Sequence, residues 1–100
     1  MREYELYLVM DAGVEEKDVS ALIEKMTQLI STGDGKTSGE VIKVDIRGKR
    51  RLTFPIRKKV ESQDIILDFQ SPPQVLAEME RILKLNEQVL RHLIVRLGEE

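Results

Sequence analysis

The sequence has no cysteine, no tryptophan and a single histidine among its 100 residues. Without cysteine the chain cannot form a disulfide, a thiolate nucleophile or a cysteine-ligated zinc site. One imidazole, that of His92, is too few for a multi-histidine metal site or a histidine pair. We therefore expect a protein without a cofactor or a metal ion, and we expect His92 to be structural or surface-exposed.

Long hydrophobic runs are also missing. No apolar stretch approaches the roughly 20 residues that a membrane-spanning helix needs, and the charged start lacks the apolar segment of a signal peptide. Hydrophobic residues make up 41% of the chain and charged residues 34%, a balance typical of a globular protein rather than a disordered one. A chain of this length has room for one core, so we expect a single domain over residues 1–100, located in the cytoplasm.

The net charge of −2 conceals an uneven distribution. Between Lys43 and Lys59 the chain carries eight basic residues and one acidic residue, Asp45, so this window has a charge of +7 while the remainder has −9. Because salt screens charges beyond about 8–10 Å, a polyanion would respond to the local field of the window. Such a run is often only a solvated surface, but its single sign and interleaved apolar residues favour a phosphate-binding surface.

The first part of the chain shows a strand pattern followed by a helix pattern. Residues 4–10 alternate between apolar and mixed positions, which predicts a strand with one buried face. From Val19 to Ile30 apolar residues recur with the spacing of an amphipathic helix, and acidic residues fill its expected first turn. The polar and glycine-rich residues 31–35 end this helix, and we expect a loop up to Gly39.

The middle of the chain predicts two strands. Alternation over residues 42–46 indicates a half-buried strand, and Gly48-Lys49 is a candidate turn. A second strand opens at residues 52–56 and is interrupted at Pro55, which suggests a sheet edge or a bulge. The apolar pattern resumes after residues 57–64, which form either a loop or a bulged continuation.

The last part predicts a helix and a strand. Ser71 followed by two prolines is a helix start, with the serine as N-cap and proline at the first helical position. The apolar stripe from Val75 to Leu83 predicts one buried helix face, and Asn86 is the expected left-handed stop. A strand from Val89 to Leu97 ends the pattern.

The resulting order, β-α-β-β-α-β, is that of the ferredoxin-like split βαβ unit. The predicted fold class is therefore α+β, with a four-stranded antiparallel sheet and two helices on one face. The other face of the sheet is left open, and its side chains decide whether it is a binding surface.

The residues do not indicate an enzyme. Phe54 lies in register with Leu52 and Ile56, so we expect it in the core, and with only four aromatic residues in the chain we expect no base stacking on it. The acidic residues are scattered, without obvious paired carboxylates. An acylphosphatase-like hydrolase needs a phosphate-cradling loop after the first strand, whereas Asp11 makes that turn acidic.

Three stretches, taken together, resemble one family. The chain opens with Met-Arg-Glu-Tyr-Glu, continues at residues 48–56 with Gly-Lys-Arg-Arg-Leu-Thr-Phe-Pro-Ile, and has Leu-Asn-Glu-Gln-Val-Leu-Arg at residues 85–91. These segments are similar, in this order, to motifs of the family of ribosomal protein six (S6) of the bacterial small subunit. The resemblance covers nearly the whole chain.

The resemblance implies a structural constituent of the small ribosomal subunit that binds the central domain of 16S rRNA together with ribosomal protein eighteen (S18). It implies no catalytic activity, and it places the protein partner on the sheet side and an exposed edge. Carried onto matching positions, the candidate RNA-binding residues are Arg2, Arg50, Arg51, Lys58, Lys84, Arg91 and Arg96.

The chain departs from the family pattern in three places. Arg47 stands where many members have tryptophan, and Phe54 replaces the usual tyrosine. The long acidic tail of some members is not expected here, since the sequence stops at Gly98-Glu99-Glu100. Two other functions share this fold: a regulatory domain that senses a small molecule, and an acylphosphatase-like hydrolase. The basic window favours the ribosomal function over the first, since a sensing domain needs no such charge.

Overall fold

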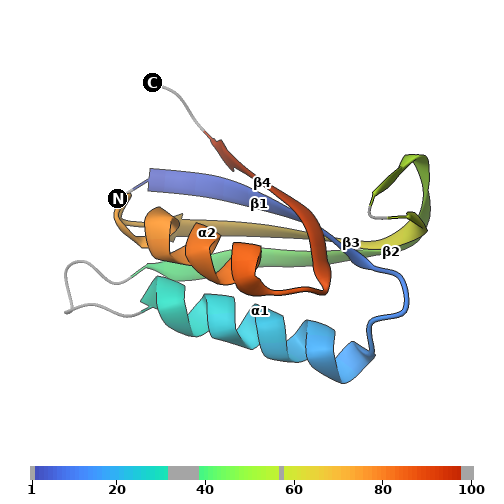
Figure 1. Ribbon diagram of the computed structural model, residues 1–100. Helices are drawn as coiled ribbons and strands as arrows, with labels where there is room; N and C mark the ends of the chain where they lie inside the picture. Colours follow the sequence, from blue (N-terminus) through green and yellow to red (C-terminus); the bar gives the residue numbers. More distant parts are fainter. Residues whose placement is uncertain (1, 32–38, 57, 98–100) are drawn as a thin grey trace.

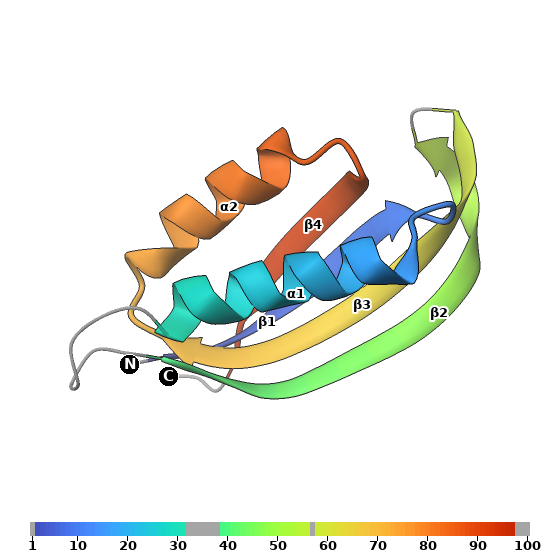
Figure 2. The same cartoon turned by 90° about the horizontal axis from the view of Figure 1, so that it is seen from below.

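The computed structural model describes residues 2–31, 39–56 and 58–97. Its elements follow the predicted order: β1 (Arg2–Asp11), α1 (Glu16–Ser31), β2 (Glu40–Ile56), β3 (Lys59–Ser71), α2 (Val75–Leu85) and β4 (Val89–Arg96). The strands form one sheet in the order β2-β3-β1-β4, and all neighbouring pairs are antiparallel. Both helices cover the same face of this sheet (Figures 1 and 2). The predicted fold class is confirmed.

The core lies between the helices and the central strands. Alternate residues of β1 and β3 point towards the helices, and each helix contributes one buried stripe. The most deeply buried apolar side chains are Leu6, Leu8, Met10, Met26, Ile30, Ile65, Leu67, Phe69, Met79 and Leu83. The predicted helical stripes are therefore core, although Ile23 and Ile82 are only half-buried at its margin. Within the described residues, neither helix is long and apolar enough to cross a bilayer.

The β2–β3 hairpin differs from the prediction. Gly48-Lys49 is not the turn but lies inside β2, where Gly48 has φ +85° next to a shift in register. Pairing continues to Ile56 opposite Lys59, so most of the undecided segment 57–64 belongs to β3. Because β1 ends at Asp11 opposite Ser62, the hairpin beyond it pairs only with itself. We call the described residues 51–56 and 58–61 the arm; it bends away from the rest of the sheet (Figures 1 and 2).

The arm explains why the core prediction for Phe54 was wrong. Its side chain is 79% exposed, because no helix reaches this far along the hairpin. The strand predicted over residues 42–46 does form, as part of β2, but its apolar side chains are less buried than expected. Ile42, Val44 and Ile46 are 42–55% exposed. Pro55 does lie on an edge strand, in a stretch of irregular register.

The predicted ends of α2 were wrong as well. Ser71 is the last residue of β3 rather than the N-cap, and its hydroxyl donates to the carbonyl of Pro72. The helix begins after Gln74, which makes no side-chain cap. Asn86 does end the helix but in an extended conformation, with φ −87° and ψ 113°, and its Oδ1 accepts the N–H of Gln88. The predicted loop over residues 32–38 lies outside the described residues, as do Met1, Arg57 and residues 98–100.

Candidate nucleic-acid interface

The seven predicted RNA-binding residues are all exposed. Six of them form no ion pair within the described part of the chain, and only Arg50 is paired. They fall into three groups: Arg2 and Arg96 at one end of the sheet; Arg50, Arg51 and Lys58 on and beside the arm; and Lys84 and Arg91 near the start of β4.

The first group lies at the end of the sheet that is remote from the arm. Arg96 of β4 lies opposite Tyr4 of β1, and Tyr4 is two residues along β1 from Arg2. The N–H of Leu97 also donates to the carbonyl of Glu3. Both arginines therefore sit on neighbouring strands. At about 3.3 Å per residue along β1, Arg2 lies roughly 30 Å and Arg96, opposite Tyr4, roughly 23 Å from the end of that strand at Asp11. A ligand that touched both this group and the arm would have to follow the length of the sheet.

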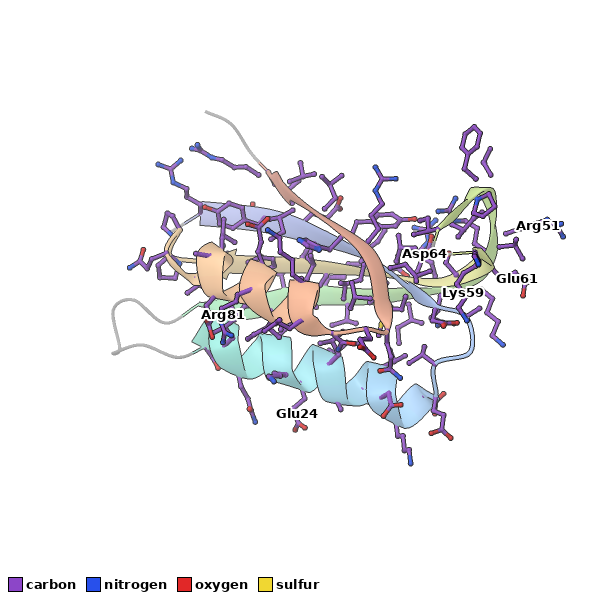
Figure 3. The ribbon with its side chains drawn as sticks, viewed as in Figure 1. Glu24, Arg51, Lys59, Glu61, Asp64 and Arg81 are labelled. Atoms are coloured by element: carbon purple, nitrogen blue, oxygen red, sulfur yellow. The ribbon has the colours of Figure 1, made fainter. Side chains whose placement is uncertain are left out.

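The second group lies on and beside the arm, where Figure 3 shows Arg51, Lys59 and Glu61 close to the hairpin end. Lys58 adopts φ +67° at the turn, and Lys59 forms an ion pair with Asp11 (Nζ to Oδ2, 3.2 Å). This ion pair ties the arm to the end of β1. The pKa of Asp11 is below its usual value, chiefly because the N–H of Gly13 donates to its carboxylate, and the bond from Lys59 lowers it further.

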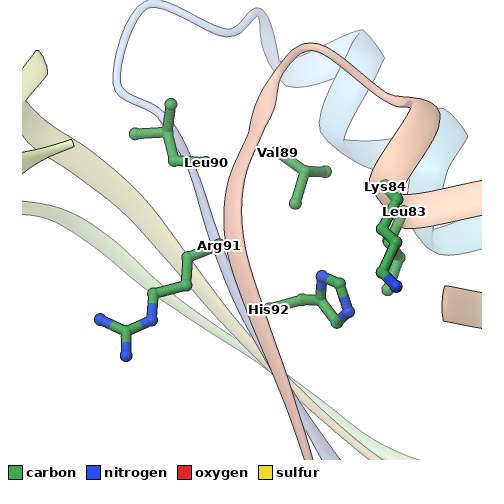
Figure 4. Close-up of a pocket in the computed structure, with 6 residues that line it drawn as sticks. All are labelled: Leu83, Lys84, Val89, Leu90, Arg91 and His92. Carbon is green, nitrogen blue, oxygen red and sulfur yellow. The ribbon is translucent and has the colours of Figure 1, made fainter. Parts of the chain in front are cut away.

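The third group surrounds the junction of α2 and β4 (Figure 4). A hollow of about 280 Å³ is lined there by Lys84, His92 and the neighbouring apolar residues. His92 is mostly buried, and its Nε2 lies 3.8 Å from Oε2 of Glu80 on α2. Arg91 precedes His92 on the strand and extends to the other side of the ribbon, away from Lys84 (Figure 4). As predicted, His92 lies on the face opposite to Leu93 and Val95.

The open face of the sheet contains a hydrogen-bond network that the sequence analysis missed. Asp64 of β3 is 1% exposed and accepts from three side chains on three strand segments. The hydroxyl of Tyr7 donates to Oδ2 (2.6 Å), the hydroxyl of Ser62 donates to Oδ1 (2.7 Å), and Nε of Arg50 donates to Oδ2 (2.7 Å). Nothing in the sequence singled out Asp64, which is one of three acidic residues of β3, with Glu61 and Asp68.

The network sets the charge state of its members. Burial raises the pKa of Asp64, but the hydrogen bonds from Tyr7, Ser62 and Arg50 outweigh it and leave the pKa below the ordinary value. The pKa of Tyr7 is raised, chiefly by its hydrogen bond to Asp64. Asp64 is therefore a carboxylate and Tyr7 a neutral donor at neutral pH. The charge of Arg50 is partly balanced, which lowers the net field of the basic window at this point.

Arg50 and Arg91 line one hollow on the open face. Together with Tyr7, Val9 and Leu93 they line a shallow hollow of about 330 Å³, although their strands, β2 and β4, are the two edges of the sheet. The nearest acid of this face is Asp64, which pairs with Val9 and accepts from Arg50. Asp45 lies opposite Ile66, and Glu5 and Asp68 lie two residues further from the arm along the register of β1.

The described residues contain no group of three or more acidic or histidine side chains that could hold a metal ion. Among the described residues, the carboxylates of Asp11, Asp64 and Glu78 have a lowered pKa, and each is engaged by a basic side chain. What this surface offers chemically is a set of exposed guanidinium and ammonium groups. Such groups suit an anionic polymer.

Comparison with known proteins agrees with these features. The chain matches the family profile described as Ribosomal protein S6 over residues 3–96. It is 43% identical over 96 residues to the small ribosomal subunit protein bS6 of Streptomyces griseus, covering 96% of each chain. It is 41% identical over 100 residues to the protein of that name from Moorella thermoacetica, covering 100% of this chain and 98% of the relative.

The fold also has a counterpart among solved structures. The 30S ribosomal protein S6 of Thermotoga maritima superposes with a TM-score of 0.81 at 24% identity, covering 96% of this chain and 87% of that chain. At this identity the likeness concerns the fold alone.

Proposed function

The chain belongs to the ribosomal protein S6 family, and from this premise we propose that it binds the central domain of 16S rRNA together with S18 as a structural constituent of the small subunit. This family consists of ribosomal proteins and not of enzymes. Ribosome association in the bacterial cytoplasm follows from the same proposal.

The observation that supports RNA binding is the placement of the unpaired cations. Arg51 and Lys58 on the arm, Arg91 on the open face and Arg96 at the far end of β4 form no ion pair within the described residues. Phosphates supply most of the affinity of RNA-binding proteins, and cations that are not already neutralised bind them most strongly. A surface of this kind spread along the sheet suits an extended RNA backbone.

The observation that supports a protein partner is a strip of exposed apolar side chains on the open face, which starts at the hollow between Arg50 and Arg91 and runs along β4. Leu93 is 59% exposed and Val95 is 40% exposed, on the edge strand β4. On the same face, Oδ1 of Asp68 is buried without a hydrogen-bond donor among the described residues. An exposed apolar strip beside an unsatisfied acceptor is what a docking protein covers, and S18 is the partner we propose.

The experiment that tests the function is co-sedimentation on a sucrose gradient. Tagged protein expressed in a bacterial cell should run with the small subunits, and a variant with Arg51, Lys58 and Arg91 changed to alanine should shift towards the top of the gradient. A variant with Lys17 and Lys25 on α1 changed to alanine is the control, because these lysines lie on the helical layer away from the proposed surface. Wild-type protein that stays at the top of the gradient would refute the proposal.

Calorimetry with purified S18 tests the partner. We expect a one-to-one complex that Leu93→Asp weakens by at least about tenfold, because a charge would enter the apolar strip. Leu85→Asp is the matched control, since Leu85 is 70% exposed but lies on α2. Equal losses from both variants, or from neither, would place the partner elsewhere.

A further inference from the structure

The hollow between Arg50 and Arg91 joins two predicted RNA-binding residues from opposite edges of the sheet. Its floor consists of Tyr7 and Val9 of β1, and Leu93 borders it on β4. Asp64 balances part of the charge of Arg50, whereas Arg91 forms no ion pair within the described residues, so the hollow keeps an excess of positive charge. The arrangement is therefore suited to a single anionic group.

Arg50 is held ready for such a contact by Asp64. The carboxylate accepts from Nε of Arg50 at 2.7 Å, and it is itself fixed by Tyr7 and Ser62 at 2.6 and 2.7 Å. Since Asp64 uses only Nε, the N–H groups on the two terminal nitrogens form no hydrogen bond within the described residues. Those donors form the planar fork with which arginine binds a phosphate.

Arg91 supplies the second contact without any such support. It is exposed, forms no ion pair within the described residues, and starts from the register position opposite Val9. It can move freely to an anion, whereas Arg50 pays less conformational entropy because its position is already fixed.

We propose that Arg50 and Arg91 together bind one phosphate of the rRNA backbone and that Asp64, with Tyr7 and Ser62, is a positioning residue for Arg50. The proposal rests on the RNA binding proposed above and assigns one phosphate to one place on the open face. The apolar floor of Tyr7 and Val9 accommodates the adjoining ribose.

RNA is favoured over a carboxylate of a protein partner by the surroundings of the hollow. It lies at the base of the arm, next to the window of charge +7 to which Arg50 belongs, while the unsatisfied acceptor Asp68 and the exposed Val95 lie further along the face. A polyanion gains from the whole of this field, and a single carboxylate gains from the two arginines only.

Filter binding of a central-domain rRNA fragment to the full chain, at several salt concentrations, tests the shared phosphate. Arg50→Ala and Arg91→Ala should each weaken binding by about tenfold, the size of a charge-assisted hydrogen bond. The double variant should lose less than the product of the two, and its salt slope should fall in magnitude by about 1, the value for one phosphate. Lys25→Ala on α1 is the control and should leave affinity and slope unchanged.

The role of Asp64 needs a readout beyond stability. Asp64→Asn should weaken RNA binding several-fold in the wild-type background and should have no further effect in the Arg50→Ala background. Arg50→Lys keeps the positive charge but loses the planar guanidinium group, which can bind the Asp64 carboxylate and a phosphate at the same time. This variant should remain folded and bind RNA more weakly than wild type. Thermal melts accompany each variant, and Arg50→Lys replaces Arg50→Ala where the latter does not fold.

The outcomes separate this proposal from the function on which it rests. Fully additive losses, with a slope reduced by about 2 in the double variant, would mean two separate phosphates and would overturn it. So would loss of S18 affinity with unchanged RNA affinity, which would assign the hollow to a protein carboxylate. Wild-type protein without measurable RNA binding, alone or with S18, would instead refute the proposed function.

Discussion

At the scale of single residues, the unusual feature is a buried carboxylate on the outer face of a sheet. Asp64 is nearly inaccessible, yet it remains charged because three donors surround it. The sequence alone could not reveal this network. Arg50 is 14 residues away and Tyr7 is 57 residues away, and only the strand register brings them together. Arg50 itself was a candidate by family resemblance, but its partner was not.

Asp64 should make stability depend on pH. Its folded-state pKa is lowered, so its contribution is present above the unfolded-state value of about 3.9 and is lost as pH falls through the folded-state pKa. We predict that Asp64→Asn lowers the free energy of unfolding by about 1–3 kcal/mol at pH 7. The deficit should shrink as pH falls below about 4. Urea titrations of both proteins from pH 2 to 7 measure it, and an equal deficit at every pH would contradict the assignment.

At the scale of elements, periodicity predicted the buried faces well and the boundaries poorly. The i, i+3, i+4 stripe of α1 is core because the helix lies directly on the sheet. The turn at Gly48-Lys49 was wrong because a glycine with positive φ can also mark a bulge inside a long strand. Phe54 was placed in the core because alternation reports which residues share a face, not whether a helix covers that face.

The helical core should dominate stability. Leu83 is 1% exposed, and we predict that Leu83→Ala costs about 2–5 kcal/mol. Ile23→Ala and Ile82→Ala should fall at or below the lower end of that range, since both side chains are only half-buried. Lys58→Ala should change stability by less than about 0.5 kcal/mol, because the side chain is exposed and unpaired within the described residues. Chemical denaturation gives all four values, and a Lys58→Ala cost equal to that of Leu83→Ala would contradict the assignment of faces.

The bulge in β2 depends on its glycine. A Cβ at Gly48 would meet no atom within 4 Å, but the backbone has φ +85°. We predict that Gly48→Ala destabilises the protein by about 1–2 kcal/mol through backbone strain alone. Gly13→Ala is the control, because its Cβ would approach only Oδ1 of Asp11 at 3.6 Å and its φ lies outside the left-handed range. Equal denaturation midpoints for the two variants would mean that the bulge relaxes without cost.

At the scale of the whole molecule, charge is distributed unevenly. The helices are nearly balanced, with five acidic and four basic residues, whereas the arm and the strand ends carry cations that form no ion pair within the described residues. With a net charge of −2, the protein alone has a small electrostatic footprint for a polyanion. The proposed partnership with S18 would enlarge that footprint.

Assembly should therefore be cooperative. Joining two RNA-binding surfaces raises affinity by effective concentration, by as much as about 10²–10⁴ without a new contact. We predict that the pair with S18 binds the rRNA fragment at least about tenfold more tightly than this chain alone. Changing Arg51 and Lys58 to alanine should weaken the RNA complex and leave the heterodimer intact. Calorimetry followed by filter binding measures both steps, and equal RNA affinity with and without S18 would contradict cooperation.

The most direct measurement of the central claim is the salt dependence of rRNA binding. Affinity for a central-domain fragment, with S18 present, would be measured between about 50 and 300 mM salt, the range over which phosphate contacts lose strength. If this surface binds the phosphate backbone through about four or five contacts, the logarithmic slope should be about −3 to −4. A slope near zero would contradict the account, because binding would then not depend on the cations of the arm and the open face.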